Sequence, residues 1–253
     1  MIFHKPFYIF FLIIFSPFVG SYLATILVRL NANLDILRPH RSKCTNCQQK
    51  LRVFDAVPIL SFVVLGGYCR YCKSPINPIY FVSEVACLIA AVTAGGFLSE
   101  AVFEEIFISL SLAWALIGLS IFDVQNKRIP DSVTIPLIFT GIAQSYFLET
   151  IDVLDSFLGL IAGGLISSLV AVIYKHFRRK TGLGWGDIKL IAAFGAWLGW
   201  QLLPLFVLIS STTALIFLLL GLILRKTNAS AIELPFGPFL CATGWCLWLH
   251  LLD

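Results

Sequence analysis

Two aspartates beside apolar runs are the residues of this chain best suited to chemistry. Asp123 ends an apolar run in LSIFDVQNKRIPD, and Asp187 begins another in GLGWGDIKL. Carboxylates at the edge of a membrane are costly, so they are candidates for function. When two carboxylates lie close together, one keeps a proton while the other stays ionised. Such a pair can activate water against a peptide carbonyl and protonate the leaving amine.

The residues around Asp187 suggest an active-site loop. Gly184 and Gly186 lack a Cβ, so they let another backbone approach closely, as an extended substrate peptide requires. Lys189 stands two positions after Asp187, and on a helix the two side chains do not face each other. We include Lys189 in the candidate loop as a residue that faces lipid headgroups or tunes the site indirectly.

Each aspartate also has a simpler interpretation. Asp123 could mark the end of an apolar helix and be neutralised by Lys127 or Arg128. Asp187 could be a first-turn acid that stabilises a helix N-terminus. Residue types alone leave both alternatives open.

A second candidate site lies in the polar segment 31–79. This segment contains KCTNCQQ and YCRYCKS, which together make C-x2-C, 21 residues, and C-x2-C. The spacing is close to the four-cysteine zinc pattern, in which two knuckles close a tetrahedral shell around a structural ion. The predicted ligands are Cys44, Cys47, Cys69 and Cys72. Disulfides or free thiols are the alternative, which a reducing compartment disfavours.

The elements that position these residues are predicted to be membrane-spanning helices. The sequence is 58% hydrophobic and 13% charged, with a mean hydropathy of +0.90, which excludes an ordinary soluble domain. Apolar runs of about 17 to 25 residues cross a bilayer as helices. We predict an all-α polytopic membrane protein with about eight spans: 7–30, 80–98, 105–122, 132–148, 154–174, 188–202, 203–224 and 234–252. Within 186–224, Gly199, Trp200 and Pro204 are the only residues that indicate where one span could end and the next begin.

The distribution of charge predicts the orientation. Lysine and arginine gather in the loops on one side of the predicted spans, including 31–79, whereas the opposite loops are acidic. Basic loops are cytoplasmic. Two predicted crossings separate Asp123 from Asp187, so both are expected at the cytoplasmic edge of the bilayer. The net charge of +4 then reflects topology, and we expect no nucleic-acid partner.

Several other chemistries lack their motifs. The four histidines are scattered and form no H-E-x-x-H, and neither a G-x-S-x-G elbow nor a Walker-type phosphate loop is present. A serine protease, a zinc protease and an NTPase are therefore disfavoured.

Taken together, the motifs resemble those of the type IV prepilin peptidase family over about residues 20–244. GSYLATILVRL is followed by VPILSFVVLGGYCRYC, then by IFDVQNKRIPDSVTIP, GLGWGDIKLIAAFGAWLG and LPFGPFLCATG, in the family's order. The resemblance places Asp123 and Asp187 as the catalytic aspartates of a G-x-G-D peptidase.

The resemblance implies two activities in a bacterial inner membrane. Members of the family cut prepilins and pseudopilins of type IV pilus and type II secretion systems after the glycine that ends a basic leader. They then methylate the new N-terminus with S-adenosylmethionine. By this resemblance the protein substrates are prepilins and pseudopilins, and the implied cofactors are structural Zn²⁺ and S-adenosylmethionine.

The chain departs from the family pattern mainly near its N-terminus. Asp55 is followed by Ala56 where the family usually has asparagine, and INPIYFVSE keeps Glu84 but loses an arginine and a proline. Asp55 and Glu84 mark a possible methyl-transfer region. We expect three parts: a first span at 1–30, a cytoplasmic zinc-binding loop at 31–79 that carries the methyltransferase-associated residues, and a multi-span peptidase domain at 80–253.

Two rival functions remain. The carboxylates could relay protons in a transporter, although both are expected near one face and no inverted repeat is visible. Alternatively, the chain could be a zinc-bearing scaffold of a pilus or secretion platform without chemistry of its own. In that case the aspartates would be dispensable and the cysteines would not.

Overall fold

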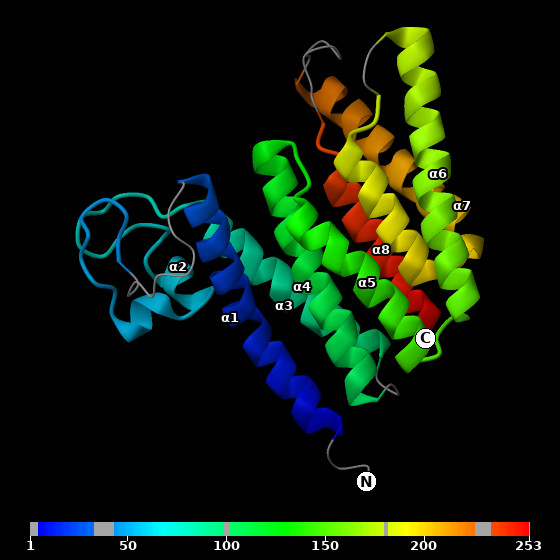
Figure 1. Cartoon of the computed structure of the whole chain (residues 1–253). Coiled ribbons are helices and arrows are strands. Elements are labelled where there is room, and N and C mark those ends of the chain that lie inside the picture. The colour runs from blue at the N-terminus through cyan, green and yellow to red at the C-terminus, as the bar shows by residue number, and fades with distance from the viewer. Residues whose placement is uncertain (1–4, 33–42, 99–101, 180–181, 226–233, 253) are drawn as a thin grey trace. The chain divides into compact units, whose positions relative to one another are not determined.

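The computed structural model describes residues 5–32, 43–98, 102–179, 182–225 and 234–252 (Figure 1). Within these ranges the regular structure is helical, apart from two isolated β-bridges, Lys43 with Lys50 and Tyr68 with Pro75. Residues 33–42, at the start of the predicted zinc-binding loop, lie outside the described residues. The prediction of an all-α protein is confirmed.

From α3 to α7 the helices follow one another with short connections, whereas longer segments follow α1, α2 and α7. In chain order they are α1 (Lys5–Asn31), the 3-10 helix η2 (Val53–Ala56), α2 (Leu60–Val64), α3 (Pro78–Phe97), α4 (Phe103–Asn126), α5 (Asp131–Phe147), α6 (Val153–Arg178), α7 (Trp185–Arg225) and α8 (Gly237–Leu252). In the described part of the chain, α1, α3, α4, α6 and α7 are long and apolar enough to cross a membrane. The chain is a multi-pass membrane protein.

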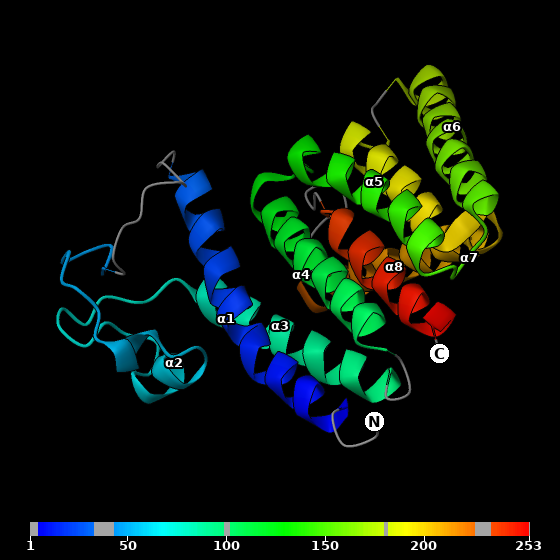
Figure 2. The same cartoon turned by 60° about the horizontal axis from the view of Figure 1, so that its bottom comes forward.

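The eight predicted spans correspond to eight helical segments, because α7 consists of two halves. Gly199 has φ 75° and ψ 171°, values that no helix residue adopts, so the helix breaks there. We predicted the division between 202 and 203, whereas the break lies at Gly199. A positive φ is easily reached only by glycine, which explains why the chain reverses at this residue. Figures 1 and 2 show the second half running back beside the first.

The chain divides into two compact units, Met1–Ile121 and Phe122–Asp253. In the first unit, α1 packs closely on α3 through small residues. The Ser83 hydroxyl donates to the Gly20 carbonyl at 2.9 Å, and the Ser16 hydroxyl donates to the Cys87 carbonyl at 2.7 Å. A Cβ on Gly20 would lie 2.6 Å from the Ser83 carbonyl oxygen, so only glycine permits this approach. Small residues and interhelical hydrogen bonds are the usual means of packing helices within a membrane.

In the second unit, the first half of α7 is the central helix. It is buried among α5, α6, α8 and its own second half (Figure 2). Leu190, Phe194 and Leu198 are at most 1% exposed, as expected for a helix that is apolar on all sides.

Polar and aromatic contacts fix the central helix against α5 and α8. The Trp197 indole donates to the Leu137 carbonyl of α5 at 2.9 Å. The same indole ring lies edge-on to Trp248 of α8, with centroids 4.9 Å apart. Against α6, Gly159 and Gly195 bring the two backbones into direct contact. These contacts fix the first half of α7, whose N-terminal end carries Asp187.

Candidate active site

Asp123 lies in the last turn of α4 and is only 5% exposed. Its Oδ2 accepts a hydrogen bond from the backbone N–H of Gly237 at 3.0 Å. Gly237 is the first residue of α8, so the carboxylate sits at a helix N-terminus, where the backbone amides favour a negative charge. A Cβ on Gly237 would lie 2.6 Å from Oδ2, and therefore this contact requires glycine.

Asp187 lies in the first turn of α7. Its Oδ2 accepts from the backbone N–H of Gly184, three residues earlier, at 3.2 Å. This is the reciprocal half of a capping box, in which an acid of the first turn satisfies the amide that precedes the helix. The simpler interpretation of Asp187 as a first-turn acid is therefore correct, and it is compatible with a catalytic role.

The fold brings together the two helix starts that hold the carboxylates. Asp187 lies at the start of α7 and Asp123 accepts from the start of α8, while Leu183 and Phe236, just before these starts, line one pocket. Asp123 is buried and Asp187 is half-buried, so neither charge is fully screened by solvent. Two carboxylates that come close in such surroundings can share one proton, which is the acid–base arrangement needed for hydrolysis.

Two glycines of GLGWGD make close contacts with neighbouring segments of the chain itself. A Cβ on Gly186 would lie 2.8 Å from the Cβ of Ile129, so the backbone that Gly186 admits is the chain's own turn between α4 and α5. Gly182 in the same way packs against the ring of Tyr174. The motif therefore serves to bring the start of α7 against neighbouring segments that set the position of Asp187.

An ion pair of Lys189 joins the start of α7 to the start of α5. Its ammonium donates to both carboxylate oxygens of Asp131, each at 2.7 Å. Asp131 begins α5, directly after the turn that follows Asp123. Gly186 and Lys189 lie within α7, and only Gly184 of the predicted active-site loop precedes the helix.

The four predicted zinc ligands form two matching knuckles. Residues 44–48 make one turn, closed by the Gln48 N–H on the Cys44 carbonyl at 3.0 Å. Residues 69–73 repeat it, with the Lys73 N–H on the Cys69 carbonyl at 3.0 Å. Gln48 and Lys73 both have a positive φ, 58° and 56°, so the two turns have the same shape.

The cysteine cluster fits a tetrahedral thiolate site. The sulfur atoms of Cys44, Cys47, Cys69 and Cys72 lie within 4.8 Å of one another. Cys44 and Cys72 are 3.8 Å apart, which matches the edge of about 3.8 Å expected for Zn–S bonds of about 2.3 Å. This separation is too long for a disulfide, whose sulfurs are about 2.05 Å apart. The cluster can hold a metal ion.

Asp55 lies within η2, and Glu84 contacts the segment between η2 and α2. The Glu84 carboxylate accepts from the backbone N–H of Ile59 at 2.7 Å, and Ile59 has a strained φ of 62°. Arg70 donates two hydrogen bonds to Oδ1 of Asp55, at 2.9 and 2.7 Å, and this guanidinium lowers the pKa of Asp55. The other oxygen, Oδ2, is buried without a hydrogen-bond partner in the described part of the chain. A strained residue and an unsatisfied carboxylate oxygen in one segment are features typical of functional sites.

Comparison with known proteins assigns this arrangement to a family. The profile of the "Type IV leader peptidase family" matches residues 110–219, and that of the "Bacterial Peptidase A24 N-terminal domain" matches residues 14–96. A prepilin leader peptidase/N-methyltransferase of Pseudomonas putida is 35% identical over 211 residues, which cover 82% of this chain and 72% of the relative. The chain belongs to the type IV leader peptidase family.

Other members of the type IV leader peptidase family show similar agreement. The prepilin leader peptidase/N-methyltransferase of Aeromonas hydrophila is 34% identical over 82% of this chain and 71% of its own length. That of Pseudomonas aeruginosa is 35% identical over 86% of this chain and 74% of its own length. No solved structure matches the chain significantly.

Sequence reasoning did not assign a role to three residues beside the two candidate catalytic aspartates. Gly237 holds Asp123, while Ile129 and Asp131 hold the start of α7. Gly237 lies in LPFGPFLCATG and Asp131 in NKRIPD, both of which we had quoted as family motifs. The signal was therefore present, but the partner of each residue is distant in sequence.

Proposed function

We propose that this chain is a membrane-embedded aspartic endopeptidase that removes the basic leader of type IV prepilins and pseudopilins after a glycine. The observation that carries the proposal is that Asp123 and Asp187 each accept a hydrogen bond from a glycine N–H at a helix start, Asp123 at α8 and Asp187 at α7. Family membership supports the same activity, because the relatives are named prepilin leader peptidases.

The two aspartates divide the work of hydrolysis. The ionised carboxylate takes a proton from a water molecule as its oxygen attacks the scissile carbonyl carbon. The protonated carboxyl donates a hydrogen bond to the carbonyl oxygen, and its proton neutralises the charge that develops there. When the C–N bond breaks, a carboxyl transfers a proton to the leaving amine. The dyad titrates as one coupled system.

The side of the membrane on which the candidate active site lies is inferred from the distribution of charged residues in the loops. The basic loops are proposed to face the cytoplasm of a bacterial inner membrane. Asp123 and Asp187 then lie at the cytoplasmic edge of the bilayer, where a prepilin presents its basic leader while its apolar segment remains in the membrane.

We also propose that the chain methylates the new N-terminus with S-adenosylmethionine, which supplies the methyl group when bound. Asp55 and Glu84 are the residues proposed for this region. The buried Oδ2 of Asp55 can accept a hydrogen bond from an amine donor, and Glu84 holds the strained backbone at Ile59. The cluster of Cys44, Cys47, Cys69 and Cys72 is proposed to bind Zn²⁺ and to stabilise this part of the chain.

The decisive experiment is cleavage of a prepilin by the purified protein in detergent, read by mass spectrometry of the products. Asp123→Asn and Asp187→Asn are each expected to lower cleavage by roughly 100-fold or more, because each removes one partner of the acid–base pair. Asp152→Asn, which changes an exposed acid at the start of α6, is the matched control and is expected to remain active.

The same products report the second activity. The wild type is expected to give a methyl-sized mass increase when S-adenosylmethionine is added, and Glu84→Gln to retain cleavage but lose that increase. Full cleavage by either dyad variant would refute the peptidase mechanism. Methylation by Glu84→Gln at the wild-type rate would refute only the proposed methyl-transfer region.

A further inference from the structure

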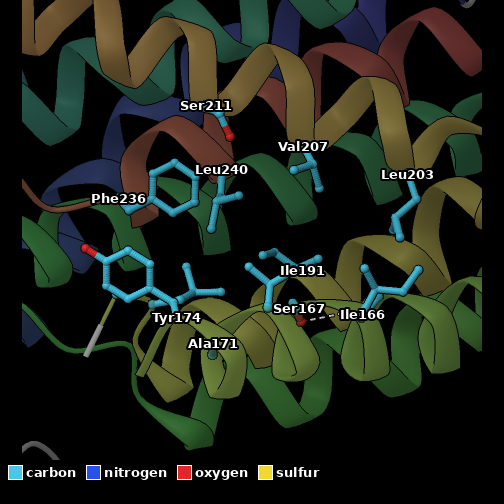
Figure 3. Close-up of a pocket in the computed structure, with 14 residues that line it drawn as sticks. Ile166, Ser167, Ala171, Tyr174, Ile191, Leu203, Val207, Ser211, Phe236 and Leu240 are labelled. Carbon is cyan, nitrogen blue, oxygen red and sulfur yellow. Dashed lines mark hydrogen bonds between the residues drawn. The ribbon is translucent and has the colours of Figure 1, made fainter. Parts of the chain in front are cut away.

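A pocket of about 400 Å³ opens within the second unit, between α6 and the second half of α7. Figure 3 shows two facing rows of side chains, with Ile166, Ala171 and Tyr174 of α6 opposite Leu203, Val207 and Ser211 of α7. Ile191 from the first half of α7 and Leu240 from α8 lie between the two rows. The pocket therefore runs along the helices.

The walls of the pocket are suited to an apolar occupant. Most of the lining side chains are aliphatic or aromatic. The Ser167 hydroxyl donates within its own helix, to the Gly163 carbonyl, so it adds little polarity to the wall. Apolar lining of this kind binds hydrocarbon side chains or lipid tails.

The α6 wall has a closed floor and an open side. Gly163 lies against the backbone of Ile191 and Ala192 in the first half of α7, and Ser167 is buried, so the small residues of α6 form the floor. Ile166, Val170 and Tyr174 are 57%, 55% and 45% exposed, so the pocket is open along one side to an apolar segment that runs along the helices. The volume of the pocket leaves room for side chains of such a segment.

One end of the pocket adjoins both candidate catalytic motifs. Its lining includes Leu183 and Phe236. Each of these residues directly precedes a glycine that holds a catalytic carboxylate, Gly184 for Asp187 and Gly237 for Asp123. An extended residue spans only about 3.5 Å, so a substrate whose scissile bond lies at the dyad reaches this end of the pocket within a few residues.

We propose that this pocket binds the apolar segment of the protein substrate that directly follows the scissile bond. The inference rests on the proposed function, and it names the part of the substrate that the enzyme recognises and the residues that recognise it. The polar leader lies on the other side of the dyad and makes no contact with the pocket. Ala171 and Val207 act as specificity-determining residues in opposite walls.

The test compares two substrates of the full-length protein in detergent. One is a prepilin with its complete apolar segment. The other is a peptide with the same leader and cleavage site that ends two residues after the scissile bond. Ala171→Phe and Val207→Phe fill the pocket, and each is expected to raise KM for the prepilin roughly 10-fold with little change in kcat. The short peptide is expected to be cleaved equally by the variants and the wild type.

The matched controls are Val172→Phe and Leu208→Phe. Each neighbours a pocket residue on the same helix, but both side chains are 60% exposed and neither lines the pocket. Both controls are expected to retain the wild-type KM for the prepilin.

The outcomes separate this inference from the proposed function. Prepilin cleavage with an unchanged KM in both pocket variants overturns the inference and leaves the peptidase intact. Equal losses with both substrates show damage to the dyad and also overturn it. If the wild type cleaves neither substrate, the proposed function itself fails, and the inference fails with it.

Cross-linking identifies the occupant directly. A photoreactive residue at position 207 in Asp187→Asn, which holds the substrate uncut, is expected to cross-link to the apolar segment of the prepilin. The same probe at position 208 is the control. Cross-links from position 207 to lipid alone would overturn the inference, because a lipid tail is the other apolar ligand that such a pocket accepts.

Discussion

At the scale of single residues, the candidate dyad depends on two glycine amides. Asp187 is bound by the N–H of Gly184, three residues away, whereas Asp123 is bound by Gly237, 114 residues away. The first contact is a local feature of a helix start, and the second exists only in the folded chain. Both carboxylates are thereby oriented before any substrate arrives, which reduces the reorganisation required during reaction.

Substitution of Gly237 tests this orientation. Gly237→Ala places a Cβ about 2.6 Å from Oδ2 of Asp123, so the carboxylate must move. We expect prepilin cleavage to fall by roughly 100-fold, since a displacement of about 1 Å at a reacting group has an effect of this size. The assay is the initial rate of cleavage, with the melting temperature measured in parallel.

Gly221→Ala is the control for this prediction. Among the described residues, no atom beyond its chain neighbours and its own helix backbone lies within 4 Å of the position that its Cβ would take, and alanine favours the helix, so activity and stability are expected to be maintained. Wild-type cleavage by Gly237→Ala would show that the contact with Asp123 is unimportant for the reaction.

At the scale of elements, the first half of α7 is the support on which the site is built. It is buried by helices from the rest of its unit, and its N-terminal end carries Asp187. Gly186 and Lys189 attach this end to the turn that follows α4. The distance between the two aspartates is therefore set by how α4, α5 and α7 meet.

Loss of the ion pair between Lys189 and Asp131 is expected to loosen this junction. The two side chains are 40% and 55% exposed, and a pair of this kind contributes up to about 1 kcal/mol. Lys189→Met and Asp131→Asn are each expected to lower kcat about two- to fivefold. Lys175→Met, at an exposed lysine near the end of α6, is the control.

A charge exchange makes this prediction specific. The double variant Lys189→Asp with Asp131→Lys restores a pair of opposite charges and is expected to recover most of the lost activity. Equal kcat values for the wild type and both single variants would show that the pair does not position the dyad.

At the scale of the whole molecule, the chain combines a multi-pass helical membrane protein with a small cysteine-rich segment. That segment has exposed apolar side chains, such as Val53 and Phe54, and its helices are short. A segment with so little core usually depends on a metal for its stability. The two knuckles bring four cysteine sulfurs together in a cluster that can hold one metal ion.

Metal analysis tests this view of the segment. The purified protein is expected to contain one zinc ion per chain, and Cys44→Ser is expected to lose it, because three thiolates bind zinc much more weakly than four. Cys246→Ser, at an exposed cysteine of α8, is expected to retain the metal. A full zinc content in Cys44→Ser would contradict the proposed ligand set.

Much of this architecture was predictable because its signals are local. Apolar runs of membrane length predicted every long helix, since a backbone in lipid must satisfy its own hydrogen bonds. The C-x2-C spacing predicted the cysteine cluster, because each knuckle is a turn of only five residues. The sequence offered Gly199, Trp200 and Pro204 as possible places for the break in α7. It could not choose among them, because the choice depends on packing against α6.

The sequence by itself determined the helical membrane architecture and the family, and it indicated the two aspartates as candidate catalytic residues. Only the tertiary structure showed which residues hold the site in place. Asp123 is held by Gly237, and Lys189 is held by Asp131. Helices that pack across long stretches of chain bring these partners together. The tertiary structure also decided what the glycines of GLGWGD do: Gly186 admits the chain's own Ile129. Local patterns fix which residues form helices, whereas packing of side chains fixes which helices meet and at which residues.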